Sequence, residues 1–204
     1  MSYTRKSSPT PHVVYQGKHC FEHWYRDNQI YLITARCRQK FPAFQNTDAK
    51  NIFWDRFEHY ARQYAFEPYI TALLNNHYHT LGYLRTGSDL GPLMQKLHGS
   101  VAKLVNDRLP ERRVPFWHHD RHRDYFDGCL RDEQQFRRSY RYIATQAQRS
   151  RLSASAVQIR ANVGLEEGLA RAVRLRALLW GVRYARYDGL NHRPAEAGPA
   201  SRGE

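Results

Sequence analysis

The stretch FEPYITALLNNHYHTLGYLR, residues 66–85, decides the fold because it reads as two strands joined by a tight turn. Residues 66–74 and 77–85 form the two strands, and Asn75 and Asn76 lie between them. Asparagine tolerates positive φ, so this pair suits a two-residue hairpin turn. The stretch therefore predicts an antiparallel hairpin.

The second strand of this hairpin begins with two histidines one residue apart. Side chains alternate along a strand with a period of two, so His77 and His79 share one face while Tyr78 points to the other. Two imidazoles on one rigid face make a chelate for a divalent metal. The alternative is that the pair is ordinary polar surface. This motif alone leaves both interpretations open.

Further elements extend outward from the hairpin on both sides. The expected elements are a strand at 28–37, a helix from Thr47 or Asp48 to about residue 64, a helix opened by Ser88 or Asp89, a strand at 124–130 and a helix at 132–150. The order is β-α-β-β-α-β followed by a helix, which is the ferredoxin-like plan. We therefore predict an α+β fold, an antiparallel sheet with two helices on one face and the other face free for a site.

The length of 204 residues and a hydrophobic fraction of 41% fit one domain with a core of its own. We expect a partly disordered lead-in over residues 1–24 and the main domain over 25–150. Residues 151–187 are expected to form a helical C-terminal extension, with one amphipathic helix at 164–181, and residues 188–204 a disordered tail.

Charge points to a polyanionic partner. Lys and Arg number 32 against 19 Asp and Glu, a formal net charge of +13, which favours nucleic acid over other partners, although a merely basic protein has the same balance.

No apolar run approaches a membrane span, and the N-terminus lacks the apolar centre of a signal peptide. Three widely spaced cysteines form no disulfide framework. We expect a cytoplasmic protein with reduced thiols and no membrane partner.

The expected helix at 132–150 separates two tyrosines by geometry. At about 100° per residue, Phe136, Tyr140 and Ile143 fall on the packing face. Tyr142 falls on a polar side, and Gln146, four residues later, sits directly above it. A phenol beside an amide suits a nucleophile next to a metal ligand. The alternative is a boundary aromatic whose ring is packed and whose hydroxyl is in water.

Three segments together resemble a known family: LLNNHYHTLGYL at 73–84, MQKLHGSVAKLVNDR at 94–108 and PFWHHDRHRDYFDGCLRDEQQFRRSYRYIATQ at 115–146. In order and spacing they look like the single-tyrosine HUH transposases, within these the REP-associated tyrosine transposases. His77-Tyr78-His79 fits histidine, bulky hydrophobic residue, histidine, and Tyr142-Ile143 matches the segment of the catalytic tyrosine. The Asn-Pro that follows in many relatives is absent. The family fold is also ferredoxin-like.

The resemblance implies a metal-dependent DNA transposase and endonuclease that nicks and rejoins single-stranded DNA. It implies Mg²⁺ or Mn²⁺ bound by His77, His79 and Gln146, with Tyr142 attacking the scissile phosphate. The products would be a 5′-phosphotyrosine and a free 3′-hydroxyl, so strands could be rejoined without ATP. The substrate is expected to carry hairpins, and the protein to act as a monomer or as a homodimer.

Basic residues around these segments are candidates for DNA contact. The candidates are Arg138, Arg149, Arg121, Arg123, His118 and His119. Arg138 or Arg149 could also help to activate the tyrosine, and the sequence does not choose between them. For His118 and His119, DNA contact or solvation is favoured over metal binding because Pro115 and the dense charge indicate a loop. The rival function is a catalytically idle, host-retained protein of the same fold that binds repeat hairpins.

Overall fold

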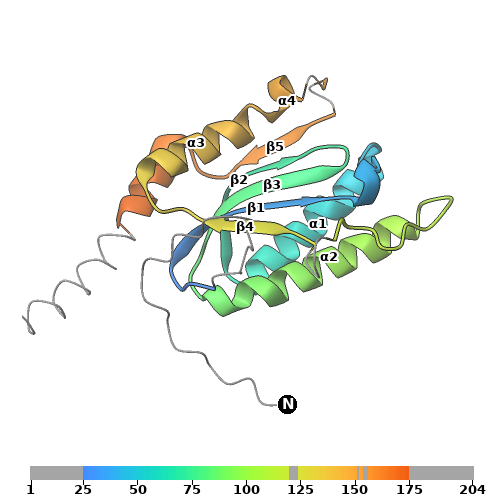
Figure 1. The fold of residues 1–204 in the computed structure, drawn as a ribbon, viewed down its shortest axis with the longest axis horizontal. Helices are drawn as coiled ribbons and strands as arrows, with labels where there is room; N and C mark the ends of the chain where they lie inside the picture. The colour runs from blue at the N-terminus through green and yellow to red at the C-terminus, as the bar shows by residue number, and fades with distance from the viewer. Residues whose placement is uncertain (1–24, 120–123, 151, 154–155, 175–204) are drawn as a thin grey trace, which may run out of the picture.

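The structure, a computed structural model, describes residues 25–119, 124–150, 152–153 and 156–174. Five strands form one antiparallel sheet in the order β4-β1-β3-β2-β5 (Figure 1). Its first elements are β1 (Gln29–Arg36), η1 (Arg38–Lys40), α1 (Thr47–Gln63), β2 (Phe66–Leu73), β3 (His77–Leu84), η2 (Gly87–Asp89), α2 (Leu90–Asn106) and β4 (Phe126–Cys129). This order and pairing confirm the α+β, ferredoxin-like prediction. The expected lead-in at 1–24 and tail at 188–204 lie outside the described residues.

Helices α1 and α2 pack on the same face of the sheet and build the larger core (Figure 1). The cap of α1 differs from the prediction. Asn46, rather than Thr47 or Asp48, holds the extended backbone of a cap, and its side chain accepts a hydrogen bond from the backbone N–H of Ala49 at 2.7 Å. The predicted residues already lie within the first helical turn. At α2 the cap position is Asp89, one of the two expected residues, but its side chain makes no capping hydrogen bond, and η2 leads the chain into the helix.

The β2–β3 hairpin forms as predicted, but its turn does not use positive φ. The backbone N–H of Leu74 donates to the carbonyl of His77 at 2.8 Å, which closes a turn of two residues, Asn75 and Asn76. Neither asparagine is among the described residues with positive φ. The two residues instead act as polar anchors. The Asn75 carbonyl accepts from the N–H of Phe44, and the Asn76 amide donates to the carbonyl of Lys40 at 3.0 Å.

The sequence led us to expect that the second face of the sheet would be free. In the structure this face is covered. Helix α3 (Glu133–Ala144) lies across it, capped by Asp132, and α4 (Gln146–Arg149) follows (Figure 1). Phe136, Tyr140 and Ile143 are buried there, as the helical angle predicts. The expected helix at 132–150 is interrupted at Thr145, whose hydroxyl donates to the carbonyl of Arg141 at 2.8 Å. The site must therefore lie beside α3.

The sheet continues beyond residue 150, where the sequence predicts only a helical extension. Strand β5 (Gln158–Ala161) pairs antiparallel with β2. The following residues, 165–174, are helical as expected, and Leu169 and Ala172 are buried on the α3 side of the sheet while Val173 is exposed. Across the described part of the chain, no helix is both long enough and apolar enough to cross a membrane.

Candidate active site

Strand β3 places the two histidines on the sheet face that α3 covers. Tyr78, between them, is fully buried on the opposite face in the α1 and α2 core, as the period of two predicts. The His77 and His79 rings lie with their centroids 5.0 Å apart, and His79 is only 5% exposed. Strand β1 runs beside them, with Thr34 opposite His79 and Arg36 opposite His77.

Tyr142 reaches this histidine pair from α3. Its hydroxyl lies 3.5 Å from Nε2 of His79, and the two rings meet edge to face with centroids 5.1 Å apart. The side chain remains partly exposed, at 37%. Tyr140 points elsewhere and donates to the carbonyl of Val163 at 2.8 Å. The separation of the two tyrosines is thus as predicted, and the Tyr142 hydroxyl points toward an imidazole.

Gln146 is close in sequence to this cluster but is held by a backbone contact. It is buried at the start of α4, and its amide nitrogen donates to the carbonyl of Tyr142 at 3.1 Å. Within the described chain, no hydrogen bond joins Gln146 to either histidine. Gln146 begins α4 directly after the helix break at Thr145, so the regular helix expected over 132–150 does not run unbroken from Tyr142 to Gln146.

Hydrogen bonds on Nδ1 fix how the two imidazoles present Nε2. Asn76 donates its amide N–H to the Lys40 carbonyl, so its oxygen accepts from Nδ1 of His77 at 2.6 Å. Nδ1 of His79 lies 2.7 Å from the Thr34 hydroxyl. The proton on Nδ1 of His77 leaves its Nε2 with a lone pair, the form that a metal ligand requires. The Thr34 hydroxyl can accept from Nδ1 of His79, which allows the same form there. Sequence reasoning missed these partners, although the strand alternation and the neighbouring Asn76 both pointed to them.

Burial keeps both imidazoles neutral. It lowers the pKa of His79 to about 3, with a smaller contribution from the neighbouring His77. Burial also lowers the pKa of His77, and the nearby positive charge of Arg36 lowers it further by a smaller amount. Neutral imidazole is the protonation state that binds metals, so the pair fits a divalent cation. Among the described residues there is no group of three or more His, Cys, Asp or Glu that could hold a metal ion.

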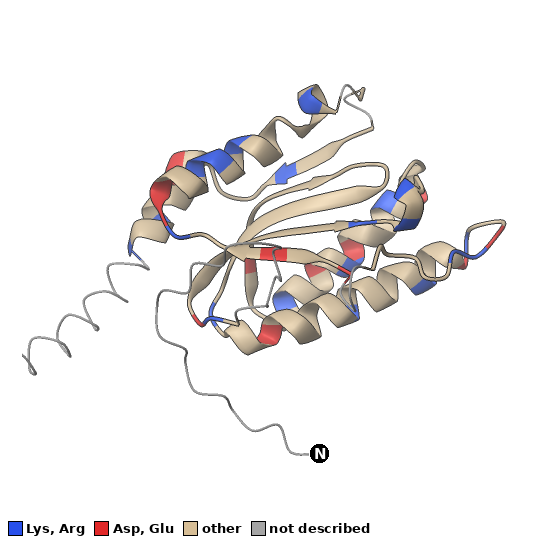
Figure 2. Ribbon diagram, in the orientation of Figure 1, with Lys and Arg blue, Asp and Glu red and all other residues tan. Residues whose placement is uncertain are grey.

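Two candidate arginines differ in their relation to Tyr142. The Arg149 guanidinium lies over the Tyr142 ring, 5.0 Å from its centroid. Arg138 instead donates to the side chain of Gln134, one turn earlier, at 3.0 Å. Figure 2 marks positions of Lys and Arg in blue along α3, in α4 and around η1. The contact geometry therefore favours Arg149 over Arg138 as the cation that acts on the phenol.

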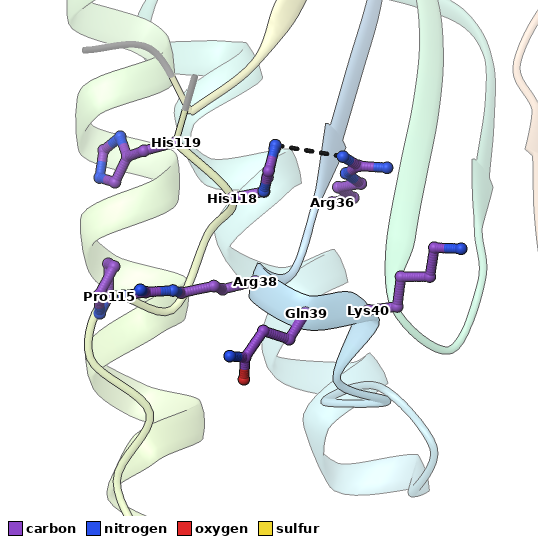
Figure 3. Close-up of a pocket in the computed structure, with 7 residues that line it drawn as sticks. All are labelled: Arg36, Arg38, Gln39, Lys40, Pro115, His118 and His119. Atoms are coloured by element: carbon purple, nitrogen blue, oxygen red, sulfur yellow. Dashed lines mark hydrogen bonds between the residues drawn. The ribbon is translucent and has the colours of Figure 1, made fainter. Parts of the chain in front are cut away.

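A basic pocket lies on the other side of the histidine pair, at the end of β1. Its volume is about 620 Å³ (Figure 3). The lining residues are Arg36, Arg38, Gln39, Lys40, Pro115, His118 and His119. His118 and His119, predicted to contact DNA, are therefore brought together with three cations that the sequence did not single out. Arg121 and Arg123 lie outside the described residues.

Comparison with known proteins adds a shared fold. No family model matches the chain, and no curated protein matches it. The solved structure of a REP-associated tyrosine transposase bound to a REP hairpin matches with a TM-score of 0.54 and 14% identity, over 65% of this chain and 74% of that one. A candidate transposase from Deinococcus radiodurans R1 has a TM-score of 0.43 and 12% identity, over 65% and 98%. The family resemblance seen in the motifs is thus matched in the fold of the first of these structures.

Proposed function

We propose that the chain is a DNA transposase of the HUH type, which nicks and rejoins single-stranded DNA through a 5′-phosphotyrosine. The observation that carries this proposal is the 3.5 Å approach of the Tyr142 hydroxyl to Nε2 of His79. The two residues are 63 positions apart in the sequence and come from different elements. A nucleophile beside a pair of neutral imidazoles suits metal-assisted transfer of a phosphodiester.

His77 and His79 are the residues proposed to hold the cation, Mg²⁺ or Mn²⁺, through their Nε2 atoms. Asn76 and Thr34 orient the rings from the Nδ1 side. Gln146 is a further candidate ligand because it lies beside Tyr142, although its amide is now bonded to the backbone. When bound, the cation would supply positive charge to a non-bridging oxygen of the scissile phosphate. Remaining coordination positions would be filled by water and phosphate.

Tyr142 is the proposed nucleophile. Its oxygen forms a bond to phosphorus as the bond from phosphorus to the 3′-oxygen breaks; water takes up the phenol proton and supplies one to the leaving oxygen. The Arg149 guanidinium over the ring places positive charge where the phenolate forms. The phosphotyrosine keeps the energy of the phosphodiester, so a 3′-hydroxyl can reverse the step without ATP. Tyr142 and both histidines meet within a single chain, which supports a site that does not borrow a tyrosine from a second copy.

The test is covalent capture. Purified protein is incubated with labelled single-stranded DNA that carries a hairpin, in Mn²⁺, and run on a denaturing gel. We expect a covalent band that disappears in EDTA and in Tyr142→Phe, and that persists in the control Tyr60→Phe on α1. A shift seen only on a native gel would instead support the rival function, a binder of repeat hairpins without strand transfer. An undiminished band in Tyr142→Phe would rule out this nucleophile.

A further inference from the structure

The basic pocket collects positive charge that no acidic side chain among the described residues neutralises. Arg36, Arg38 and Lys40 line it, and in the described part of the chain none of the three forms an ion pair with a carboxylate. Arg36 instead donates to Nε2 of His118 at 3.1 Å, and this partner is not a carboxylate, so the guanidinium charge is left uncompensated. Figure 3 shows Arg36 and His118 joined in this way. The pocket is therefore suited to an anion.

The backbone that carries these cations is held in place. Gln39 and Lys40 both have positive φ, 55° and 56°, which is uncommon for residues other than glycine and occurs where the surroundings impose it. The N–H of Arg38 donates to the Phe116 carbonyl at 2.9 Å, and the N–H of Cys37 donates to the Asn76 carbonyl at 2.7 Å. A strained segment held by these two hydrogen bonds presents its side chains without a large ordering cost on binding.

The pocket is physically connected to the histidine pair. Arg36 lies opposite His77 in the register of β1 and β3. The Asn76 side chain bridges the two regions, since it donates to the carbonyl of Lys40 and accepts from Nδ1 of His77. A strand of DNA whose scissile phosphate lies at Tyr142 and His79 can therefore bring a neighbouring phosphate toward this pocket.

We infer that the basic pocket binds a backbone phosphate of the single-stranded DNA next to the cleaved phosphodiester, an inference that rests on the proposed function. Within the described part of the chain, the lining offers guanidinium, ammonium and imidazole groups but no phenyl, phenol or indole ring on which a base could stack. Contacts of this kind position a strand without reading its sequence. The pocket thus contributes affinity that depends on salt and not on base identity.

The experiment measures how affinity depends on salt, in EDTA, so that no covalent step occurs. The probe is a fluorescein-labelled hairpin with an unpaired tail of about ten nucleotides, read by anisotropy. The pocket variant is Arg38→Gln/Lys40→Gln, and its matched control is Arg62→Gln/Lys96→Gln, which removes two exposed cations from α1 and α2. A circular dichroism melt shows that both variants fold.

For the pocket variant we expect affinity to fall about tenfold and the slope of log K against log salt to become shallower by about 1.4, which corresponds to two lost contacts with single-stranded phosphate. The control should keep the wild-type slope. If the pocket variant has the same slope as the control variant, the inference is wrong. It is also wrong if the pocket variant loses as much affinity for a blunt hairpin with no tail as it loses for the tailed hairpin. The covalent capture assay is independent: an adduct with no change of slope refutes only the pocket, and a changed slope with no adduct refutes only the transposase.

Discussion

The two faces of strand β3 carry histidine clusters with opposite properties. On the α1 and α2 face, the Tyr78 hydroxyl bonds to Nε2 of His98 at 2.9 Å, and Nδ1 of His98 bonds to Asp124 at 2.7 Å. His98 is 1% exposed and stacks on Trp117, with ring centroids 4.4 Å apart. On the α3 face, His77 and His79 have partners on Nδ1, while Nε2 of His79 faces a tyrosine hydroxyl at the long distance of 3.5 Å.

The difference separates a histidine whose two ring nitrogens both bond within the core from a pair that we propose takes part in the chemistry. Both nitrogens of His98 are used inside the protein. Burial alone would raise the pKa of Asp124, but the hydrogen bond and the charge of His98, with smaller contributions from the backbone and from His119, together outweigh burial and lower that pKa. In this cluster the ring nitrogens of His98 have hydrogen-bond partners, so removing the His98 side chain lowers the stability of the fold. The His77 and His79 pair keeps an outward nitrogen and a neutral ring, which contributes little to folding and is useful to a ligand. Each of the following predictions tests one side of this contrast.

The largest effect is expected for His79→Ala on the α3 face. Loss of one proposed metal ligand should lower the rate of adduct formation by about 1,000-fold. The melting temperature should change less than in a variant of the other cluster. The rate is followed by time courses on denaturing gels with saturating Mn²⁺. A rate within a factor of about three of wild type would remove His79 from the chemistry.

On the opposite face, His98→Ala should lower the free energy of unfolding by about 3 kcal/mol, because it leaves the Tyr78 hydroxyl and Asp124 without their partner and opens a cavity beside Trp117. Urea unfolding at neutral pH measures this value. Tyr78→Phe, which deletes only the hydroxyl, should cost about 1 kcal/mol. The folded His98→Ala protein should still form the adduct below its melting temperature. If His98→Ala lowers the free energy of unfolding no more than His79→Ala does, the two histidine clusters do not differ in the way described.

Acid should destabilise the protein through the α3 face. The unfolded chain has a histidine with a pKa of 6.5, and burial lowers the pKa of His79 in the folded chain to about 3, so the folded state binds fewer protons in this window. Stability is therefore lost as the pH falls below 6.5, by about 2 kcal/mol at pH 5 from His79 alone. Unfolding in EDTA should show a shallower pH dependence for His79→Gln. The control His59→Gln, at an exposed position on α1, should keep the wild-type slope.

The smallest effect is expected for the hydroxyl that orients His79. Thr34→Val removes the partner of Nδ1 and should reduce adduct formation about tenfold, since such partners set the orientation and tautomer of a ligating imidazole. Thr71→Val is the matched control, because the Thr71 hydroxyl lies on the neighbouring strand β2 and bonds to Thr80. Raising the Mn²⁺ concentration should restore most of the Thr34→Val rate. An equal loss in both variants would assign the effect to folding.

Sequence patterns predicted those parts of the fold that depend on local periodicity. The alternation in β3 places His77 and His79 opposite Tyr78, and the helical angle separates Tyr140 from Tyr142. Strand β5 was missed because its four residues carry no pattern of their own and pair with a strand formed far earlier in the chain. The covering of the second face by α3 follows from tertiary packing, which no local pattern reports.

The sequence predicted that His77, His79 and Tyr142 share a site. It did not predict the contacts that surround them. The break at Thr145 divides the expected helix, and the contact of the Gln146 amide with the Tyr142 carbonyl is seen only in the structure. Arg149 could be chosen over Arg138 only from the ring contact. The basic pocket joins segments 82 residues apart at Arg36 and His118, a juxtaposition that depends on the completed sheet.

The most direct test of the account is Mn²⁺ binding followed by electron paramagnetic resonance, because the central claim is that the two imidazoles on the α3 face hold the cation. Free Mn²⁺ gives a sharp signal that is lost on binding. We predict that wild type and His98→Gln bind Mn²⁺ alike and that His77→Ala/His79→Ala weakens binding by at least about 100-fold. Equal Mn²⁺ affinity in wild type and the double variant would contradict the account.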